Sequence, residues 1–370
     1  MIVLSLYLPG VHGVARDIYF MKHQVCYPLS VKHIFERMIT MRKGKLVPFI
    51  SVLMIAGLVV TGCSQAQPTA TTPTSAPAAT TAPAEDSAKG VKTAIESYFT
   101  NIGSKVTNAY KISEKDLKAA LDKNPDQYVI LDLRKGDVYA QGHIKGAINI
   151  PYGAEIAKNL DSIRSLAKDK TVVVACYTGQ TGGQTDALLN LAGIKTLSLN
   201  AGMGGSSVGF DTKGWLGLKY PTVTEPTVMP TGTAVASKNK AIDVAVQKYF
   251  NDVPADSYKI DLPVMKAALA KDADKYYIVD VREAADFAKG HIKGAVNIPY
   301  GPEIAKKLDS MKTESAGKTL IVYCYTGQTG GQVDALLNIY GIPTKSLNLG
   351  FGVEGSNKGW SADKSYEVVK

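Results

Sequence analysis

The sequence has few cysteines: Cys26, Cys63, Cys176 and Cys324 are the only ones in 370 residues. So few cysteines argue against a disulfide framework as the basis of the fold. No cluster of His and Cys has the spacing of metal ligands, so we expect no bound metal and no other cofactor. No run of Lys and Arg with interleaved aromatic residues is present, which argues against a nucleic-acid-binding face.

The charge is unevenly distributed. The chain carries a net charge of +9, of which +5 falls in residues 1–62, so the remainder is only mildly basic. A positive segment at residues 41–45 precedes an uncharged apolar run at residues 46–60. That run is too short to span a membrane comfortably, so residues 41–62 are predicted to be a secretory signal peptide.

The end of this signal, Val60-Thr61-Gly62-Cys63, resembles the lipobox of bacterial lipoproteins. The resemblance implies that Cys63 is lipidated, becomes the mature N-terminus and holds the protein on the outer side of a cell membrane. An uncleaved signal anchor with an incidental cysteine is the alternative. Residues 1–40 fit no such signal, so we interpret them as an over-extended start. Residues 63–88, rich in Thr, Pro and Ala, are predicted to be an extended tether.

Most of the remaining chain is an internal duplication. Corresponding residues lie 148 positions apart, as Asp132 and Asp280 do, a period typical of whole domains. The offset slips by three at each end. We predict one domain over residues 89–222, a turn-rich linker over 223–238 and a second domain over 239–370.

Each copy contains the same nine-residue segment, Cys-Tyr-Thr-Gly-Gln-Thr-Gly-Gly-Gln, beginning at Cys176 and Cys324. A β-branched run precedes it and a helical pattern follows, so each cysteine is placed at a strand-to-helix turn. In such a loop, convergent backbone N–H groups and the helix dipole favour an anion, so we expect a reactive thiolate. The alternative is a buried core cysteine. No Lys follows the glycines, which excludes a nucleotide P-loop.

Strands alternate with helices in each copy. This order predicts parallel βαβ units, and hence two α/β domains, each a three-layer sandwich. Predicted strands include residues 128–133 and 277–281, and predicted helices include residues 155–166 and 303–311.

Both copies resemble rhodanese (sulfurtransferase) domains, on the cysteine loops, on Asp132-Leu133-Arg134 and Asp280-Val281-Arg282, and on a Gly-His-Ile-Lys-Gly-Ala segment at Gly142 and Gly290. The resemblance implies a five-stranded, mainly parallel sheet flanked by helices, with a persulfide-forming cysteine in a six-residue loop. The catalytic residues would be Cys176 and Cys324. The substrate-binding loops would contain Tyr177, Thr178, Gly179, Gln180 and Thr181, and Tyr325, Thr326, Gly327, Gln328 and Thr329.

Other polar residues near the loops are interpreted as structural. Asp132 with Arg134, and Asp280 with Arg282, are expected to form buried ion pairs that support the loops, although they could help to bind an anion. His143 and His291 are expected to be structural turn histidines, because a preformed thiolate needs no general base. Many family members carry a basic residue after the cysteine, where Tyr177 and Tyr325 stand. Val138 stands where the second copy has Asp286, which predicts weaker support in the first copy.

The expected reaction moves a sulfane sulfur from thiosulfate or a similar anion to cyanide or a thiol through a cysteine persulfide. A phosphatase or arsenate reductase of related fold would need an Arg closing the loop, where Gly182 and Gly330 stand. The same pattern is also compatible with a sulfur or selenium carrier without turnover, and with a purely structural pair of domains.

Overall fold

The computed structural model describes residues 84–104, 108–230, 235, 237–354 and 357–370. The chain divides into two units, residues 1–75 and 76–370, and every described residue belongs to the second. The predicted signal peptide, Cys63 and most of the predicted tether therefore lie outside the described residues. Among the described helices, none combines the length and the hydropathy needed to cross a bilayer.

The first copy is built on a five-stranded parallel sheet with the strand order β1-β5-β4-β2-β3. Its strands are β1 (Lys111–Ile112), β2 (Tyr128–Asp132), β3 (Ile148–Asn149), β4 (Thr171–Ala175) and β5 (Thr196–Leu199). Its helices are α2 (Ala84–Thr100), α3 (Glu114–Lys123), α4 (Gly136–Gln141), α5 (Ala154–Lys158), α6 (Leu160–Leu166), α7 (Gln180–Leu191) and α8 (Gly214–Gly217).

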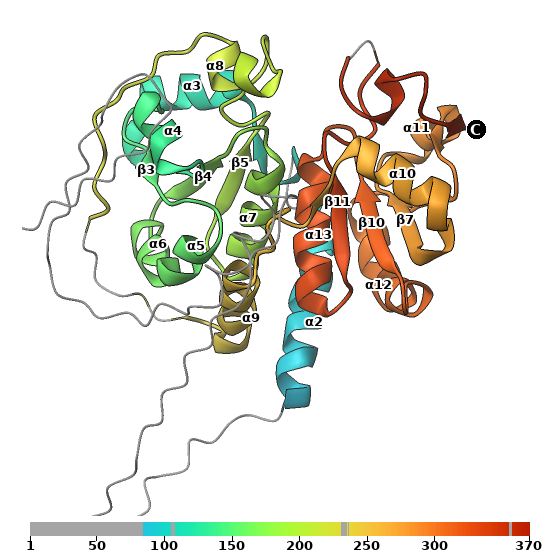
Figure 1. Cartoon of the computed structure of the whole chain (residues 1–370). Coiled ribbons are helices and arrows are strands. Elements are labelled where there is room, and N and C mark those ends of the chain that lie inside the picture. The colour runs from blue at the N-terminus through green and yellow to red at the C-terminus, as the bar shows by residue number, and fades with distance from the viewer. Residues whose placement is uncertain (1–83, 105–107, 231–234, 236, 355–356) are drawn as a thin grey trace, which may run out of the picture. The chain divides into compact units, whose positions relative to one another are not determined.

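The second copy repeats this topology, with the strand order β6-β11-β10-β7-β9, again parallel throughout (Figure 1). Its strands are β6 (Lys259–Ile260), β7 (Tyr276–Asp280), β9 (Ala295–Asn297), β10 (Thr319–Tyr323) and β11 (Thr344–Leu347), with a separate antiparallel pair of β8 (His291–Ile292) and β12 (Val368–Val369). Its helices are α9 (Lys240–Asn251), α10 (Leu262–Asp272), α11 (Ala284–Lys289), α12 (Pro302–Glu314) and α13 (Gln328–Tyr340). The predicted fold class is confirmed.

The central strands explain where the cysteines lie. Every residue of β4 is buried, as its run of Thr, Val and Ala predicts for a strand covered on both faces. β2 and β4 pair in register from Tyr128 with Thr171 to Asp132 with Ala175. Because parallel strands end at the same edge, this register places Asp132 beside the residue that precedes Cys176. The same pairing joins Asp280 to Tyr323 in the second copy.

Three helix boundaries differ from the prediction. The helix predicted over residues 155–166 is divided into α5 and α6 at Asn159. Helix α7 begins at Gln180, inside the predicted six-residue loop, and continues through Gly182 and Gly183. Glycine is a weak helix former, so packing rather than propensity sets this boundary. Helix α2 begins at Ala84, so residues 84–88, predicted as the end of the tether, are helical.

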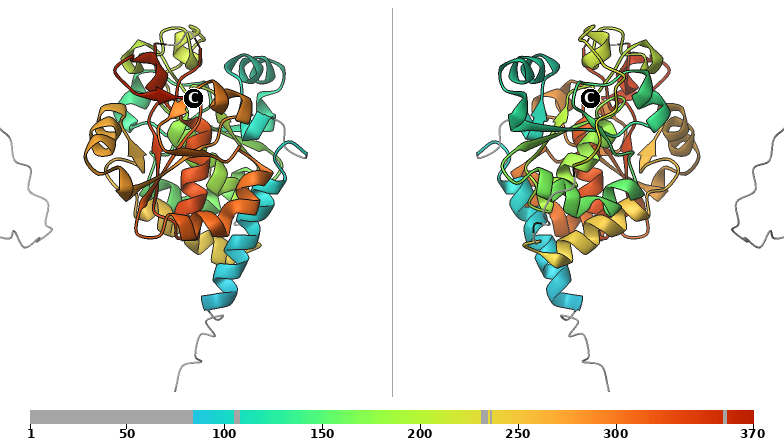
Figure 2. Two further views of the ribbon diagram at one scale, coloured as in Figure 1. Left: turned by 90° about the vertical axis from the view of Figure 1, so that its right-hand side faces the viewer. Right: turned by 90° about the vertical axis from the view of Figure 1, so that its left-hand side faces the viewer.

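The first helices of the two copies are exchanged. Helix α2 precedes the first sheet in the chain but packs on α12 of the second copy, where Lys92 Nζ lies 2.6 Å from Asp309 Oδ2. Helix α9 precedes the second sheet but packs on the first copy, where Asp243 accepts two hydrogen bonds from Arg164 at 2.6 and 2.7 Å. Figure 2 shows α2, in cyan, alongside the orange helices of the second copy. One hydrophobic core consequently continues through both copies.

Helices α7 and α13, which follow the two cysteine loops, pack against each other at the centre (Figure 1). They approach so closely that a methyl group added at Gly183 would lie 2.2 Å from the Gln328 carbonyl oxygen. At the equivalent Gly331, it would lie 2.5 Å from the Gln180 carbonyl oxygen. The two glycines therefore permit the contact between the copies.

Candidate active site

The Cys176 side chain lies inside a turn of backbone N–H groups. The amides of Gly179 and Gly182 donate to Cys176 Sγ at 3.1 and 3.2 Å. Gly179 has a φ of 97°, a left-handed conformation that glycine adopts without steric cost and that directs its N–H into the turn. The first turn of α7 adds the positive end of a helix dipole. This geometry suits a thiolate or another anion at the sulfur position.

The second copy reproduces the arrangement. The amides of Gly327 and Gly330 donate to Cys324 Sγ, both at 3.2 Å, and Gly327 has a φ of 94°. Gly182 and Gly330, at the positions where a phosphatase would carry arginine, here supply backbone donors. Among the described residues, no group of three or more His, Cys, Asp or Glu side chains is placed to hold a metal ion.

Both sulfur atoms are enclosed. Cys176 is 1% exposed and Cys324 is 3% exposed, as a buried core cysteine would be. A cavity of about 210 Å³ adjoins the first loop and is lined by Tyr177, Met203 and Gly204 among others. Cys176 itself is not among the residues that line this cavity.

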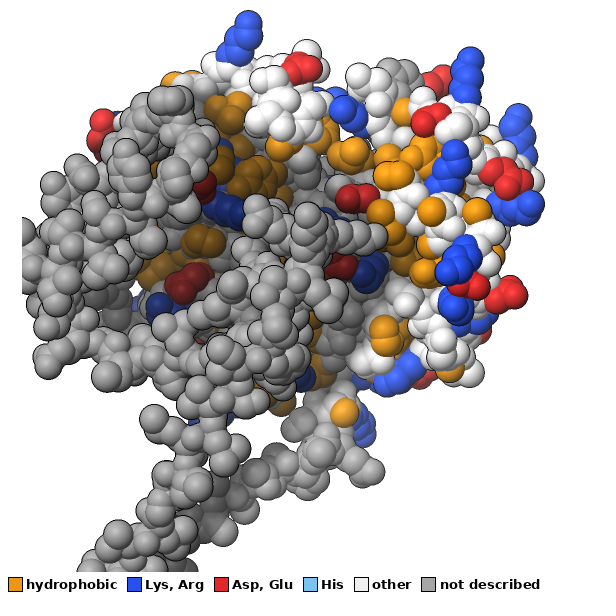
Figure 3. All heavy atoms as spheres, in the orientation of Figure 1, with side chains coloured by type: hydrophobic (Ala, Val, Ile, Leu, Met, Phe, Trp, Pro, Cys, Tyr) orange, Lys and Arg blue, Asp and Glu red, His pale blue; other side chains and the backbone are white. Residues whose placement is uncertain are grey.

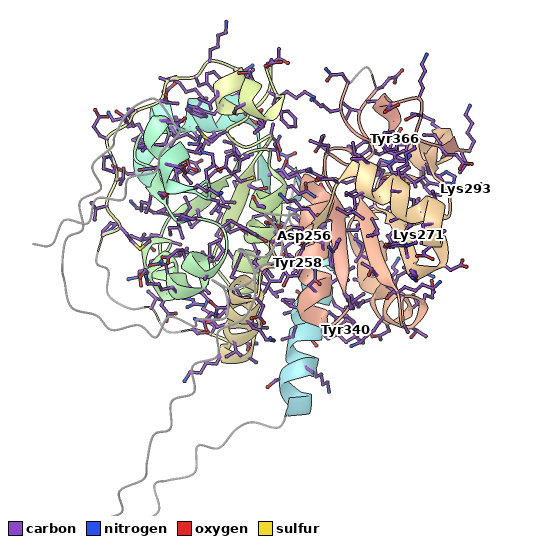
Figure 4. The ribbon with its side chains drawn as sticks, in the orientation of Figure 1. Asp256, Tyr258, Lys271, Lys293, Tyr340 and Tyr366 are labelled. Carbon is purple, nitrogen blue, oxygen red and sulfur yellow. The ribbon has the colours of Figure 1, made fainter. Side chains whose placement is uncertain are left out.

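The opening beside the second loop differs in size and composition. It measures about 20 Å³ and is lined by Tyr325 and Thr326, together with Phe210 and Lys213 of the first copy. A cavity of about 720 Å³ lies elsewhere in the second copy. Lys293, one of its lining residues, is labelled in Figure 4, and no residue of either cysteine loop lines that cavity. On the face of the second copy seen in Figure 3, basic and acidic side chains are interspersed.

The predicted ion pairs beneath the loops are confirmed. Arg134 Nη2 lies 2.6 Å from Asp132 Oδ2 and also donates to the Gly142 carbonyl at 2.8 Å, with both side chains buried. Arg282 and Asp280 repeat the pair at 2.6 Å. Nε and Nη2 of each arginine bond within the protein, which supports a structural role, and Arg134 also lines the cavity beside the first loop.

The residues that follow the cysteines are supported differently in the two copies. The Tyr325 hydroxyl donates to Asp286 Oδ2 at 2.5 Å. Burial, as the larger cause, and this hydrogen bond, as the second, raise the pKa of Tyr325 to about 12. In the first copy, where Val138 replaces the aspartate, the Tyr177 hydroxyl instead accepts from the Lys135 amide at 3.3 Å. The two tyrosines therefore have different partners, and weaker local support in the first copy stays a prediction.

Both histidines lie near backbone carbonyls, as expected of structural residues, but His291 belongs to strand β8 rather than to a turn. Both ring nitrogens of the fully buried His143 lie near backbone carbonyls, Nδ1 at 2.9 Å from Tyr139 O and Nε2 at 3.0 Å from Glu225 O. Glu225 lies in the predicted linker, so residues 223–227 are fixed against the first copy rather than being free. His291 Nδ1 lies 3.1 Å from Phe287 O.

Several predicted loop residues connect the two copies. The Gln180 amide donates to Ser346 Oγ at 2.7 Å, and the Gln328 amide donates to Ser198 Oγ at 2.7 Å. The Thr329 hydroxyl accepts from Lys111 at 3.2 Å. The side chains of Gln180 and Gln328 are therefore committed to the interface, whereas they were predicted to line a substrate site. Thr178 and Thr181 are half-buried, and Thr326 is exposed.

Sequence reasoning missed the final glutamine of each nine-residue segment. Gln184 donates to both oxygens of Asp334 at 3.1 Å, and Gln332 donates to Asp186 at 3.0 and 3.1 Å. Burial raises the pKa of both carboxyls well above the usual range, while these amides and neighbouring serine hydroxyls oppose the shift. The sequence did contain a signal for this role, because Gly-Gly-Gln is identical in both copies although an anion-binding turn alone does not require that glutamine.

A pair of tyrosines also lies beside each site. The hydroxyls of Tyr152 and Tyr249 lie 3.3 Å apart, and Tyr249 donates to Asp334 at 3.5 Å. Burial raises the pKa of Tyr152 well above its usual range, with nearby Asp334 and Cys176 adding to the shift. Tyr258, which Figure 4 places between the copies, stacks on Tyr249 with ring centroids 4.6 Å apart. Beside Cys324 the equivalent pair is Tyr98 and Tyr300, whose hydroxyls also lie 3.3 Å apart, so each cysteine site borders a buried, tyrosine-rich interface.

Comparisons with known proteins find similar chains among sulfurtransferases. The chain is 31% identical over 93 residues to the thiosulfate:glutathione sulfurtransferase of Saccharomyces cerevisiae, covering 22% of this chain and 66% of the yeast protein. It is 32% identical over 78 residues to the tRNA sulfurtransferase of Thermoplasma acidophilum, covering 21% of this chain and 14% of that protein. The solved thiosulfate sulfurtransferase of Pseudomonas aeruginosa is 23% identical, with a TM-score of 0.29, over 74% of this chain and 49% of the other.

The chain thus matches slightly less than two thirds of the yeast relative and a smaller part of the other two proteins. The model of the rhodanese-like domain matches residues 113–205 and 264–363, together just over half of the sequence. Each matched range contains one cysteine loop, the strand that leads into it and the aspartate–arginine pair beneath it. The chain belongs to the rhodanese-like family and contains two such domains in tandem.

Proposed function

We propose that this protein is a membrane-anchored, extracytoplasmic sulfurtransferase that carries sulfane sulfur as a persulfide on Cys176 and Cys324. The observation that supports it most is that two backbone amides donate to each sulfur at 3.1–3.2 Å, in both copies. Such a turn stabilises the negative charge of a thiolate and later that of a persulfide.

The reaction would proceed in two displacements. The thiolate attacks the outer sulfur of thiosulfate, an S–S bond to cysteine forms, the S–S bond of thiosulfate breaks, and sulfite leaves with the electron pair. A cyanide or thiolate acceptor then attacks the terminal sulfur and restores the cysteine thiolate. Thiosulfate and glutathione are named for the yeast relative, which supports a sulfane donor and a small thiol acceptor here. No step requires a metal or a cofactor.

A second function is favoured by the enclosure of both sulfurs. With exposures of 1% and 3%, a persulfide on either cysteine would be shielded from small thiols. The protein would then hold sulfur, or selenium, and release it only to a partner that opens the site. This carrier function uses the same amides and the same cysteines, and differs only in turnover.

Intact mass and turnover together separate the two functions. Thiosulfate should add about 32 Da, one sulfur atom, to each reactive cysteine. Continuous thiocyanate production from thiosulfate and cyanide supports the enzyme, whereas a stable adduct without thiocyanate supports the carrier. Cys176→Ser and Cys324→Ser should each remove one of the two adducts. If neither an adduct nor thiocyanate forms in the wild-type protein, both functions are wrong.

The membrane attachment rests on the sequence alone. Cys63→Ala, expressed in a bacterium that modifies lipoproteins, should move the protein from the membrane fraction to the soluble fraction and abolish incorporation of labelled palmitate. A membrane-bound Cys63→Ala protein would instead indicate an uncleaved signal anchor.

A further inference from the structure

Each cysteine loop packs against the chain segment that follows the next strand of its sheet. We call this segment the wall of the site. In the first copy the Met203 amide donates to the Cys176 carbonyl at 2.7 Å, and the Gly204 amide donates to the Tyr177 carbonyl at 2.9 Å. This wall continues directly from Ser198 and Leu199 at the end of β5. The position of β5 therefore sets the position of the Cys176 loop.

A side chain from the second copy fixes this wall. The Gln328 amide donates to Ser198 Oγ at 2.7 Å and to the Leu199 carbonyl at 3.2 Å. The same side chain packs against Gly179, where an added methyl group would lie 3.2 Å from Gln328 Cδ and Oε1. Gly179 supplies one of the two amides that donate to Cys176 Sγ. The Gln328 side chain thus contacts both the wall and Gly179, whose amide donates to Cys176 Sγ.

The arrangement is reciprocal. The Gln180 amide donates to Ser346 Oγ at 2.7 Å, and its Oε1 would lie 3.1 Å from a methyl group at Gly327. Ser346 precedes the wall of the second site, where the Phe351 amide donates to the Cys324 carbonyl at 2.7 Å. Gln180 Oε1 is buried and has no hydrogen-bond partner among the described residues.

Each glutamine belongs to the loop of one cysteine yet makes its side-chain hydrogen bonds to the opposite copy. Gln180 is 2% exposed and Gln328 is 4% exposed, so neither can exchange these partners for water. A buried amide that loses its partner destabilises the protein, which holds the two side chains in these positions.

We propose that Gln328 is a positioning residue for Cys176 and that Gln180 is a positioning residue for Cys324, each acting across the interface between the copies. Neither site is then complete without the loop of the other. The inference deepens the proposed function, because it concerns the same two cysteines, but its test measures thiol chemistry and needs no sulfur transfer.

The test follows both cysteines in one protein. The full chain is treated with iodoacetamide from pH 5 to 10, and mass spectrometry of the two cysteine peptides gives a separate rate–pH profile for each thiol. Gln328→Met keeps the side-chain volume but removes the amide donor. We expect the half-maximal pH of Cys176 to rise by about one unit, the effect of weakening one hydrogen bond to a charged group, while that of Cys324 stays unchanged. Gln180→Met should give the opposite pattern.

Two further variants keep the result interpretable. Ser198→Ala removes the acceptor in the wall and should reproduce the Gln328→Met shift at Cys176, even if Gln328→Met folds poorly. Gln247→Met is the matched control, because Gln247 also donates across the copies, to Ala157 O at 3.4 Å, and is expected to shift neither cysteine.

Two results would overturn the inference. One is a Gln328→Met shift that is larger at Cys324, the cysteine of its own loop. The other is an unshifted Cys176 profile in both Gln328→Met and Ser198→Ala. Failure of the proposed function would be seen separately, as wild-type protein that gains no sulfur from thiosulfate.

Discussion

The close contact between α7 and α13 predicts that a larger residue at Gly183 destabilises the protein. An alanine at this position would place its methyl group 2.2 Å from the Gln328 carbonyl oxygen, a backbone atom on a buried helix. Ordinary contacts of this kind begin above 3 Å, so the two helices must separate by about 1 Å. Separation also lengthens the hydrogen bonds of Gln180 and Gln328 across the interface.

The net effect follows from three contributions. Overpacking costs about 1–3 kcal/mol, and each weakened hydrogen bond costs about 1 kcal/mol. The better helix propensity of alanine offsets about 1 kcal/mol. We therefore expect Gly183→Ala to lower the free energy of unfolding by about 2–4 kcal/mol. Urea denaturation of the full chain, followed by circular dichroism, measures this difference.

Two companion variants sharpen the test. Gly90→Ala, in α2, has no atom within 4 Å of the added methyl group and should raise the free energy of unfolding by about 0.5–1 kcal/mol. Gly331→Ala should behave like Gly183→Ala. The double variant should lose less free energy of unfolding than the two single variants together, because one displacement of the helices relieves both clashes. Gly183→Ala as stable as the wild type would refute the close approach of α7 and α13.

Three further predictions follow from single residues. Arg134→Met leaves Asp132 buried without its partner and should lower the free energy of unfolding by about 3–5 kcal/mol, measured by urea denaturation at pH 7. Burial raises the pKa of Asp334 in the folded state, so the folded protein loses stability as the pH rises from about 4 through that pKa. Asp334→Asn should therefore be more stable than the wild type at pH 8, and the gain should shrink towards pH 4; a gain independent of pH would contradict this. Asp286→Val, which imitates the first copy, should lower the pKa of Tyr325 from about 12 towards 10, as followed by absorbance at 295 nm during alkaline titration.

The sequence by itself determined the α/β class, the duplication and the location of both cysteines. These features depend on local patterns: buried β-branched strands such as β4, helices of ordinary length, and a glycine-containing turn between them. The ion pair of Asp132 and Arg134 was also predictable, since two opposite charges beside a buried strand are seldom left unpaired.

Only the tertiary structure decided how the two copies share their parts. The exchange of α2 and α9 could not be predicted, because an amphipathic helix shows that it buries one face and not which copy covers that face. The roles of Gln180 and Gln328 were hidden for a similar reason. Their partners, Ser346 and Ser198, lie more than a hundred residues away in sequence, and contacts that distant leave no periodicity in the chain.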